Sequence, residues 1–262
     1  MCADFDADGW IDIFVANDAT PNQLWINRRN GTFEDRALSA GVAVNAAGQN
    51  EAGMGITAGD YDQDGDWDVF ISHDTGETNT LFRHLTAGLF EDATSSARLG
   101  HPSLPFTGFG TQWFDYDNDG WLDLFVANGS VRKLPGSLGE AYPYAQSHQL
   151  FRNVEGRFVE TSSAAGPGLT APSVGRGAAF GDIDNDGDID LVLANNNGPL
   201  RVILNECGAR NHWLRFLLEG TRSNRDAYGA RVAVELEGGL TLWQRAGADG
   251  SYLSSSDRRV HF

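Results

Sequence analysis

Acidic nine-residue loops recur four times along this 262-residue chain. Each loop has carboxylates at positions 1, 3, 5 and 9 and a glycine at position 6, and the copies span residues 4–12, 60–68, 115–123 and 182–190. Crowding carboxylates into one turn is unfavourable, because two unit charges about 4 Å apart repel by roughly 4 kcal/mol at an effective dielectric near 20. A bound hard cation would turn that repulsion into coordination.

The donor set predicts calcium rather than magnesium. Calcium accepts about six to eight oxygen ligands in flexible geometry, whereas magnesium demands a strict octahedron and tends to keep its waters. The glycine suits a sharp turn with positive φ, and position 7 would offer a backbone carbonyl. We expect about four Ca²⁺ sites, with these ligands: Asp4, Asp6, Asp8, Trp10, Asp12; Asp60, Asp62, Asp64, Asp66, Asp68; Asp115, Asp117, Asp119, Trp121, Asp123; Asp182, Asp184, Asp186, Asp188, Asp190.

Two other interpretations fit the loops less well. An EF-hand shares the opening Asp-x-Asp-x-Asp-Gly but needs a glutamate at position 12 and a flanking helix. Position 12 is Val15, Ile71, Val126 or Leu193, within short β-branched and aromatic runs typical of buried strands. The loops are therefore predicted to connect strands. Plain solvated turns would explain one copy but not four with the same fixed positions.

Composition narrows the classes of partner. The chain has a formal net charge of −17, and loop positions 1, 3, 5 and 9 hold sixteen of its 36 acidic residues. Nucleic acids and anionic membrane surfaces need clustered Lys and Arg, so neither is expected as a partner. No apolar run is long enough for membrane insertion. The two cysteines, Cys2 and Cys207, leave both a disulfide and two free thiols open.

The sequence on either side of the loops repeats as well. The loops start 56, 55 and 67 residues apart, a period typical of propeller blades. Strands are predicted before them at 53–59, 108–114 and 175–181, and after them at 22–27, 79–84, 148–153 and 201–205. Turns then lead to fourth strands at 32–35, 89–92 and 157–160. Four short strands make one blade, so the prediction is an all-β chain of propeller blades.

These loops and strands resemble FG-GAP repeats, also called VCBS repeats, which also form the integrin α-subunit propeller. The resemblance covers residues 1–205. Residues 206–262, including 211–221, 223–232 and 250–254, resemble the small β domain called ASPIC or UnbV. Together they look like the cartilage acidic protein family and its bacterial relatives. The first repeat lacks its opening strand and the last domain stops early, so we interpret the chain as a fragment with an open ring.

Loop lengths point to a face that binds partners. The calcium loops are first connections, so they share one face of the disc with the third connections, while second connections and inter-blade links lie on the other. The second connection of the third unit carries a long insertion, 129–147, and long loops on a rigid scaffold often bind partners. We predict partner contacts there from Arg132, Lys133, Tyr142 and Tyr144; a neutral surface elaboration is the alternative.

The sequence carries no nucleophile, zinc or phosphate-binding motif, and its repeated carboxylates are already assigned to metal. His148 stands where other units have Asn22 and Asn79, which predicts a strand-edge role. We therefore expect no enzyme but a calcium-stabilised adhesion module that binds extracellular protein or glycan through the face opposite the calcium loops. The alternatives are a lyase-like enzyme acting on polysaccharide and a passive spacer. Calcium-poor cytoplasm would leave the sites empty, which places the protein outside the cell, at the cell surface or in the periplasm.

Overall fold

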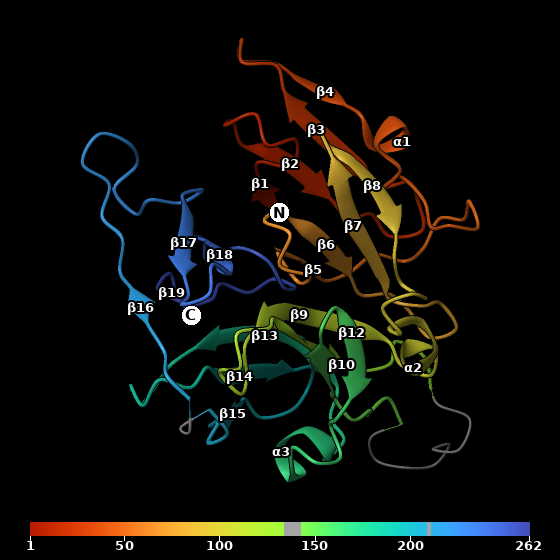
Figure 1. Ribbon diagram of the computed structural model, residues 1–262. Coiled ribbons are helices and arrows are strands. Elements are labelled where there is room, and N and C mark those ends of the chain that lie inside the picture. Colours follow the sequence, from red (N-terminus) through yellow and green to blue (C-terminus); the bar gives the residue numbers. More distant parts are fainter. Residues whose placement is uncertain (134–142, 209–210) are drawn as a thin grey trace.

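Short antiparallel strands dominate the structure, a computed structural model that describes residues 1–133, 143–208 and 211–262. Four sheets follow one another along the chain, and each acidic loop joins the first two strands of its sheet (Figure 1). The prediction of an all-β propeller is confirmed: the four sheets are blades arranged as a β-propeller. The loops are strand connections, as their β-branched flanks indicated.

The blades consist of consecutive strands paired in chain order. Blade 1 contains β1 (Cys2–Ala3), β2 (Asp12–Val15), β3 (Gln23–Asn27) and β4 (Phe33–Asp35). Blade 2 contains β5 (Ile56–Gly59), β6 (Asp68–Ile71), β7 (Thr80–Thr86) and β8 (Leu89–Asp92). Blade 3 contains β9 (Gly108–Phe114), β10 (Asp123–Asn128), β11 (Gln149–Val154) and β12 (Arg157–Glu160). Blade 4 contains β13 (Gly175–Gly181), β14 (Asp190–Asn195) and β15 (Arg201–Ile203).

Two blades differ from the predicted pattern. The two residues of β1 pair with β2, so the first unit has a short opening strand where none was expected. Blade 4 has three strands rather than four in the described residues, because the chain leaves it after β15 for the C-terminal part. Single-turn helices α1 (Ala37–Ala40), α2 (Gly100–Ser103) and α3 (Pro167–Thr170) complete the connections. Among the described residues, no helix is long and apolar enough to cross a membrane.

Aromatic side chains fill the spaces between neighbouring blades. Phe5 of the first loop packs edge-on against Phe90 of blade 2, and Tyr61 of the second loop stacks on Trp113 of blade 3. Blades 3 and 4 share a third buried cluster. No cluster of the described residues joins blade 4 to blade 1. The blades therefore form an arc that is open between its two ends.

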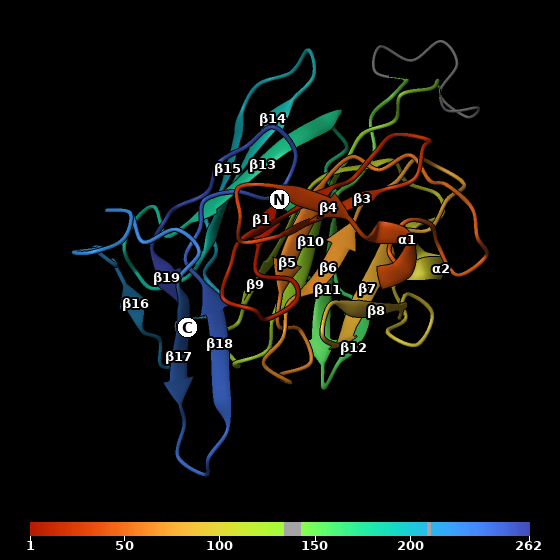
Figure 2. The same cartoon turned by 90° about the horizontal axis from the view of Figure 1, so that it is seen from above.

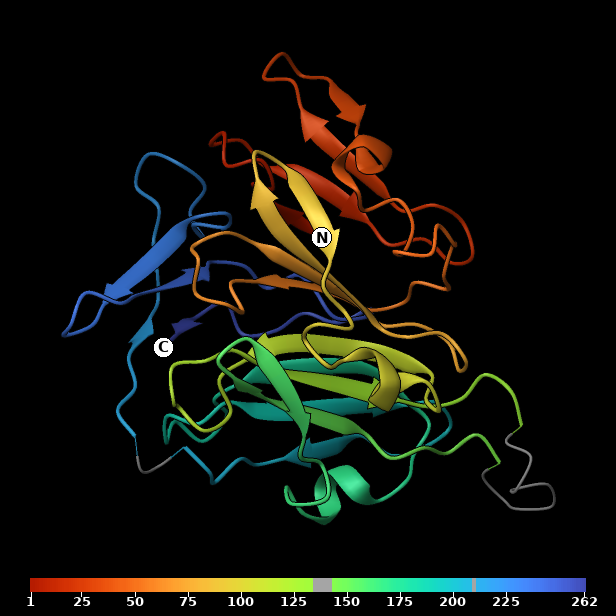
Figure 3. The ribbon, with the colours of Figure 1, turned by 45° about the vertical axis from the view of Figure 1, so that its right-hand side comes forward.

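The C-terminal part lies in that opening (Figures 1 and 3). Its strands form two small ladders, one of β16 (Arg215–Phe216) with β19 (Val260–His261) and one of β17 (Arg231–Glu235) with β18 (Thr241–Arg245). We call residues 211–262 the small domain. The predicted boundary between residues 205 and 206 stays a prediction.

One stretch of the small domain, the axial segment 249–257, reaches the inner strand of every blade. Asp249 accepts a hydrogen bond from the Cys2 amide of β1, and Ser251 exchanges backbone hydrogen bonds with Ile56 of β5. Tyr252 packs edge-on against Phe109 of β9. Asp257 donates its amide to the carbonyl of Phe180 in β13. These contacts tie the four blades together from the centre of the arc.

His148 has the strand-edge role that its place in the repeat predicted. In blades 1 and 2 the carboxamides of Asn22 and Asn79 accept the amide N–H of Asn17 and of His73. In blade 3 Nδ1 of His148 accepts the Asn128 amide at 3.1 Å. Nε2 of the same ring lies 2.9 Å from the Ser173 hydroxyl. The ring is therefore held neutral, and its burial lowers the pKa of His148 to about 4.

The presence of histidine at position 148, where blades 1 and 2 have asparagine, predicts that the stability of the protein depends on pH. An unfolded histidine takes up a proton near pH 6.5, whereas folded His148 resists protonation down to a pKa of about 4. The contribution of His148 to the free energy of unfolding is thus complete above pH 6.5 and is lost as the pH falls toward 4. Between pH 7 and 5 the free energy of unfolding should fall by about 2 kcal/mol more in the wild type than in His148→Asn. Urea titrations at both pH values measure this, and parallel curves would contradict it.

Candidate metal centres

The first carboxylate of each loop closes the turn on its glycine. The amide of Gly9 donates to Asp4 at 2.9 Å and that of Gly120 to Asp115 at 2.7 Å. Loops 2 and 4 repeat the bond at 3.1 Å, to Asp60 and Asp182. All four glycines have φ between 87° and 98°, the left-handed region that favours glycine. The predicted role of position 6 is confirmed.

The ninth carboxylate ties the loop to the third strand of its blade. Asp123 is fully buried and accepts the amides of Tyr116 at 3.1 Å and Asn153 at 2.7 Å. Asp12, Asp68 and Asp190 accept the two corresponding amides in their own blades. Position 9 is thus both a ligand candidate and a structural anchor. The sequence predicted only the first role.

The structure brings together three carboxylates in every loop, with oxygens within 4.8 Å of one another. The groups are Asp4, Asp6 and Asp8; Asp60, Asp62 and Asp68; Asp115, Asp117 and Asp123; Asp182, Asp184 and Asp190. Loops 2, 3 and 4 therefore gather positions 1, 3 and 9, whereas loop 1 gathers positions 1, 3 and 5. The ligand role of the remaining predicted positions, including the position-7 carbonyls of Trp10, Asp66, Trp121 and Asp188, stays a prediction.

Unpartnered oxygens show that these groups fit a cation. Every loop has at least one buried carboxylate oxygen without a hydrogen-bond partner: Oδ1 of Asp6, Asp60, Asp62, Asp117 and Asp182. Burial raises the pKa of Asp60 and Asp115 to about 7 and that of Asp123 to about 9. A divalent ion would supply the missing partner and reverse this effect on the pKa. All-oxygen donors in a flexible loop suit calcium.

Position 5 faces an arginine in two loops. Asp8 pairs with Arg29 at 2.7 Å and Asp119 with Arg152 at 2.8 Å. In the second loop Arg83, at the strand position of Arg152, lies 3.9 Å from Asp62 of position 3. These pairs offset part of the negative charge of the loops.

Blade 4 obtains its arginine from elsewhere. Leu204 occupies the strand position that Arg83 and Arg152 hold in blades 2 and 3, and Arg215 of the small domain instead pairs with Asp182. The repeat pattern missed this partner because it lies outside the repeats.

Position 4 of each loop also has a positive φ, like position 6, and the repeat pattern did not single it out. Ala7, Gln63, Asn118 and Asn185 all have φ between 53° and 63°. Asn tolerates this region better than most residues, so the two asparagines were the available signal. Asn118 also donates to Asp188 at 3.2 Å, which links the third and fourth loops.

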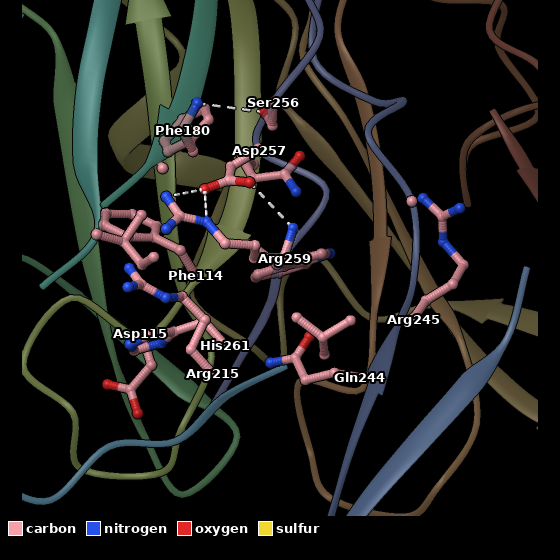
Figure 4. A pocket seen from close by; sticks show the side chains of 16 residues that line it. Phe114, Asp115, Phe180, Arg215, Gln244, Arg245, Ser256, Asp257, Arg259 and His261 are labelled. Carbon is pink, nitrogen blue, oxygen red and sulfur yellow. Dashed lines mark hydrogen bonds and ion pairs between the residues drawn. The ribbon is translucent and has the colours of Figure 1, made fainter. Parts of the chain in front are cut away.

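The small domain packs against the acidic loops of blades 2 and 4. Arg231 contacts the Gly65 carbonyl and stacks between the rings of Trp67 and Trp243. Nε2 of His261 lies 2.8 Å from the Gly187 carbonyl. Between the domain and the blades is a cavity of about 90 Å³, and Figure 4 shows Arg215 and Asp115 on its wall. These contacts engage part of the face that carries the acidic loops within the chain.

The opposite face carries two adjoining cavities of about 450 and 460 Å³. Figure 2 shows the β14–β15 connection, which lines both, on the side away from the β17–β18 hairpin. We call the two cavities the blade 3–4 groove. Its lining is Ser130, Val131, Pro143, Tyr144, Ala145, Pro172, Ser173, Val174, Arg176, Asn195, Asn196, Asn197, Gly198, Pro199 and Arg201.

The residues predicted to bind partners are divided by the structure. Tyr144 lines the groove, whereas Arg132 pairs with Asp74 at 2.8 Å. Lys133 is exposed, and Tyr142 lies outside the described residues. Their role as partner contacts stays a prediction. Cys2 and Cys207 are both exposed and unpaired.

Comparisons with known proteins match the repeats and the C-terminal part of the chain to two separate family models. A family model described as FG-GAP-like repeat matches residues 4–71 and 60–126, and one described as ASPIC and UnbV matches residues 220–262. Cartilage acidic protein 1 of Homo sapiens and that of Mus musculus are each 30% identical in an alignment of 260 residues that covers 96% of this chain. The Xenopus tropicalis protein is 29% identical over the same length. The chain spans 36–37% of the length of these relatives.

A solved structure is also similar. It was described as the basis for specific recognition of non-reducing terminal N-acetylglucosamine by an Agrocybe aegerita lectin, and it matches with a TM-score of 0.45 and 17% identity. The match covers 95% of this chain and 66% of that one. This distant likeness carries no argument about ligands. The repeats, the domain that follows them and the relatives agree: the chain belongs to the family of FG-GAP-like repeat proteins with an ASPIC and UnbV domain, to which cartilage acidic protein 1 belongs.

Proposed function

We propose that this protein is a calcium-stabilised extracellular module that binds protein or glycan partners through the face opposite the calcium loops. The observation that carries the proposal is the placement of the small domain. It packs on Gly65, Asp182 and Gly187 of the calcium loops, so that face is engaged within the chain. The blade 3–4 groove on the other face offers two adjoining cavities.

The calcium chemistry supports a location outside the cell. Extracellular modules bind calcium with a Kd of about 10⁻⁴ to 10⁻³ M. Sites of that strength are filled at extracellular calcium concentrations and empty in cytoplasm. The relatives are named for cartilage, a tissue that consists largely of extracellular matrix. We place this protein outside the cell, at the cell surface or in the periplasm.

We assign no catalytic step to the chain. The repeated carboxylates are held by loop amides and arginines, and they fit a cation better than general acid and base roles. A polysaccharide lyase remains the rival to be tested. It would release sugar ends with a new double bond, which absorb ultraviolet light, whereas a binding module leaves the glycan intact.

Blocking each face in turn tests the proposal, and the test does not require the partner to be identified first. In a Cys2→Ser, Cys207→Ser background, Asn197→Cys places one thiol in the groove and Glu237→Cys places one in the exposed β17–β18 turn. Each thiol is then coupled to a bulky polyethylene glycol maleimide. Retention is measured on a panel of immobilised matrix proteins and glycans in the presence of calcium.

The polymer at position 197 should abolish retention of every partner that the uncoupled protein holds, and the polymer at position 237 should leave it unchanged. The opposite result would place binding on the face that carries the calcium loops and refute the proposal. Glycan cleavage by the uncoupled protein would favour the lyase. Absence of retention of any partner by the uncoupled protein would indicate a passive spacer, and full retention in both coupled forms would place binding outside the groove and refute the proposal.

A further inference from the structure

We infer that the blade 3–4 groove binds an acidic saccharide, a sugar chain that carries carboxylates, and this inference rests on the proposed function of the open face. The first observation is its charge. Although 36 of 262 residues are acidic, the described residues of the groove lining include two arginines and no aspartate or glutamate. A lining whose described charges are all positive, in so acidic a protein, is complementary to an anion.

Arg176 supplies the inner positive charge. Its guanidinium donates to the carbonyls of Gly129 at 2.8 Å and Gly175 at 2.7 Å and lies 4.0 Å from the ring centre of Phe109. These contacts fix the group but do not neutralise it. No described carboxylate forms an ion pair with it. The charge of Arg176 is therefore preorganised at one end of the groove.

Arg201 supplies the outer positive charge in the same way. It donates to the carbonyls of Ala171 at 2.7 Å and Pro172 at 3.1 Å, and it has no carboxylate partner among the described residues. Ser173 lies beside it in the lining and accepts a hydrogen bond from neutral His148. The Ser173 hydroxyl is thus free to donate its own proton to a bound anion.

The remaining lining suits the neutral parts of a sugar. Oδ1 of Asn195 is buried and has no hydrogen-bond partner among the described residues, and its Nδ2 group donates to the Pro199 carbonyl. Side-chain amides both donate and accept hydrogen bonds, so they can pair with sugar hydroxyls, which do the same. The carboxamides of Asn196 and Asn197 line both cavities, and the ring of Tyr144 lines one of them. Tyrosine offers an apolar ring face and a polar tip.

A saccharide fits this arrangement better than an acidic peptide. Two separated cations with amides and a hydroxyl between them match a chain that repeats both hydroxyls and carboxylates. A peptide would need a strand edge or apolar pockets for its side chains. Within the part of the lining that the structure describes, Tyr144 is the one aromatic residue. We therefore take the peptide as an outcome that the test must exclude.

Calorimetry with a short uronate tests the inference. Trigalacturonate is titrated into the calcium-loaded chain, and its methyl ester serves as a neutral ligand with the same backbone. The double variant Asn196→Asp, Asn197→Asp adds two negative charges to exposed positions while preserving side-chain shape. Asn50→Asp makes the same change at an exposed position in the link between blades 1 and 2 and is the matched control.

We expect the acid to bind, the ester to bind at least tenfold more weakly, and added salt to weaken the acid alone. The double variant should lose about five- to tenfold in affinity, with unchanged melting, and Asn50→Asp should match the wild type. Equal binding of acid and ester, or of a polyglutamate peptide and the acid, would overturn the inference. So would a double variant that binds like the wild type. If the uronate fails while the polymer at position 197 still blocks a partner, the binding function stands and only the ligand class is wrong.

Discussion

Asp123→Ala is expected to lower the free energy of unfolding by about 4 kcal/mol, even in a calcium chelator. The side chain is fully buried and accepts the amides of Tyr116 and Asn153. Its loss leaves two buried donors unpaired, each costing roughly 1–3 kcal/mol, and adds a small cavity. Urea unfolding followed by tryptophan fluorescence measures the change.

Asp119→Ala is the control within the same loop. Asp119 is less buried and pairs with Arg152 at the surface, so in chelator its loss should change stability by less than about 1 kcal/mol. Both variants should lose calcium at the third loop if position 5 is also a ligand. A loss below about 1 kcal/mol for Asp123→Ala in chelator, like that of the control, would mean that position 9 has no structural role beyond the ion.

Removing calcium should lower the melting temperature by roughly 10–25 °C. With 1 mM calcium and a Kd of about 10⁻⁴ M, each site contributes about 1.4 kcal/mol through mass action. Four independent sites then add about 6 kcal/mol, and each kcal/mol moves the melting point by about 2–4 °C in a chain of this size. Thermal melts in calcium and in chelator, paired with calorimetric counting of bound ions, measure both quantities.

Magnesium at the same concentration is the control, because an oxygen-rich flexible loop does not meet its demand for strict octahedral geometry. It should restore little of the lost melting temperature. A melting point that is the same in calcium and in chelator would show that the orphaned oxygens of Asp6, Asp60 and Asp182 are satisfied without metal.

The blades were predictable because the information for each is local and repeated. A loop such as 115–123, followed by a run of six buried residues in β10, defines a turn and a strand by itself. The glycine at position 6 and the role of His148 followed from comparing one repeat with another. The same comparison placed the insertion on the face opposite the loops.

Features that depend on contacts distant in sequence were not predictable. The sequence around Arg215 does not predict its pair with Asp182, because that pair depends on how the small domain docks on the blades. The missing fourth strand of blade 4 has the same origin. Position 9 was assigned to metal alone, because a pattern of side chains does not show which backbone amides will meet them. The groove combines Arg176 and Arg201 with Tyr144 of the insertion, which no single motif contains.

The axial segment has a consequence for how the chain reaches its native state. Each blade is built from neighbours in sequence, so it can form soon after its residues are synthesised. The hydrogen bond between Cys2 and Asp249 closes a loop of 247 residues, and contacts of such high sequence separation slow folding. Blades 1 to 4 should therefore form early and populate an intermediate in which they are not yet docked firmly on one another. Their final registration should be the slow, late phase of folding, reached only after the axial segment 249–257 has been made.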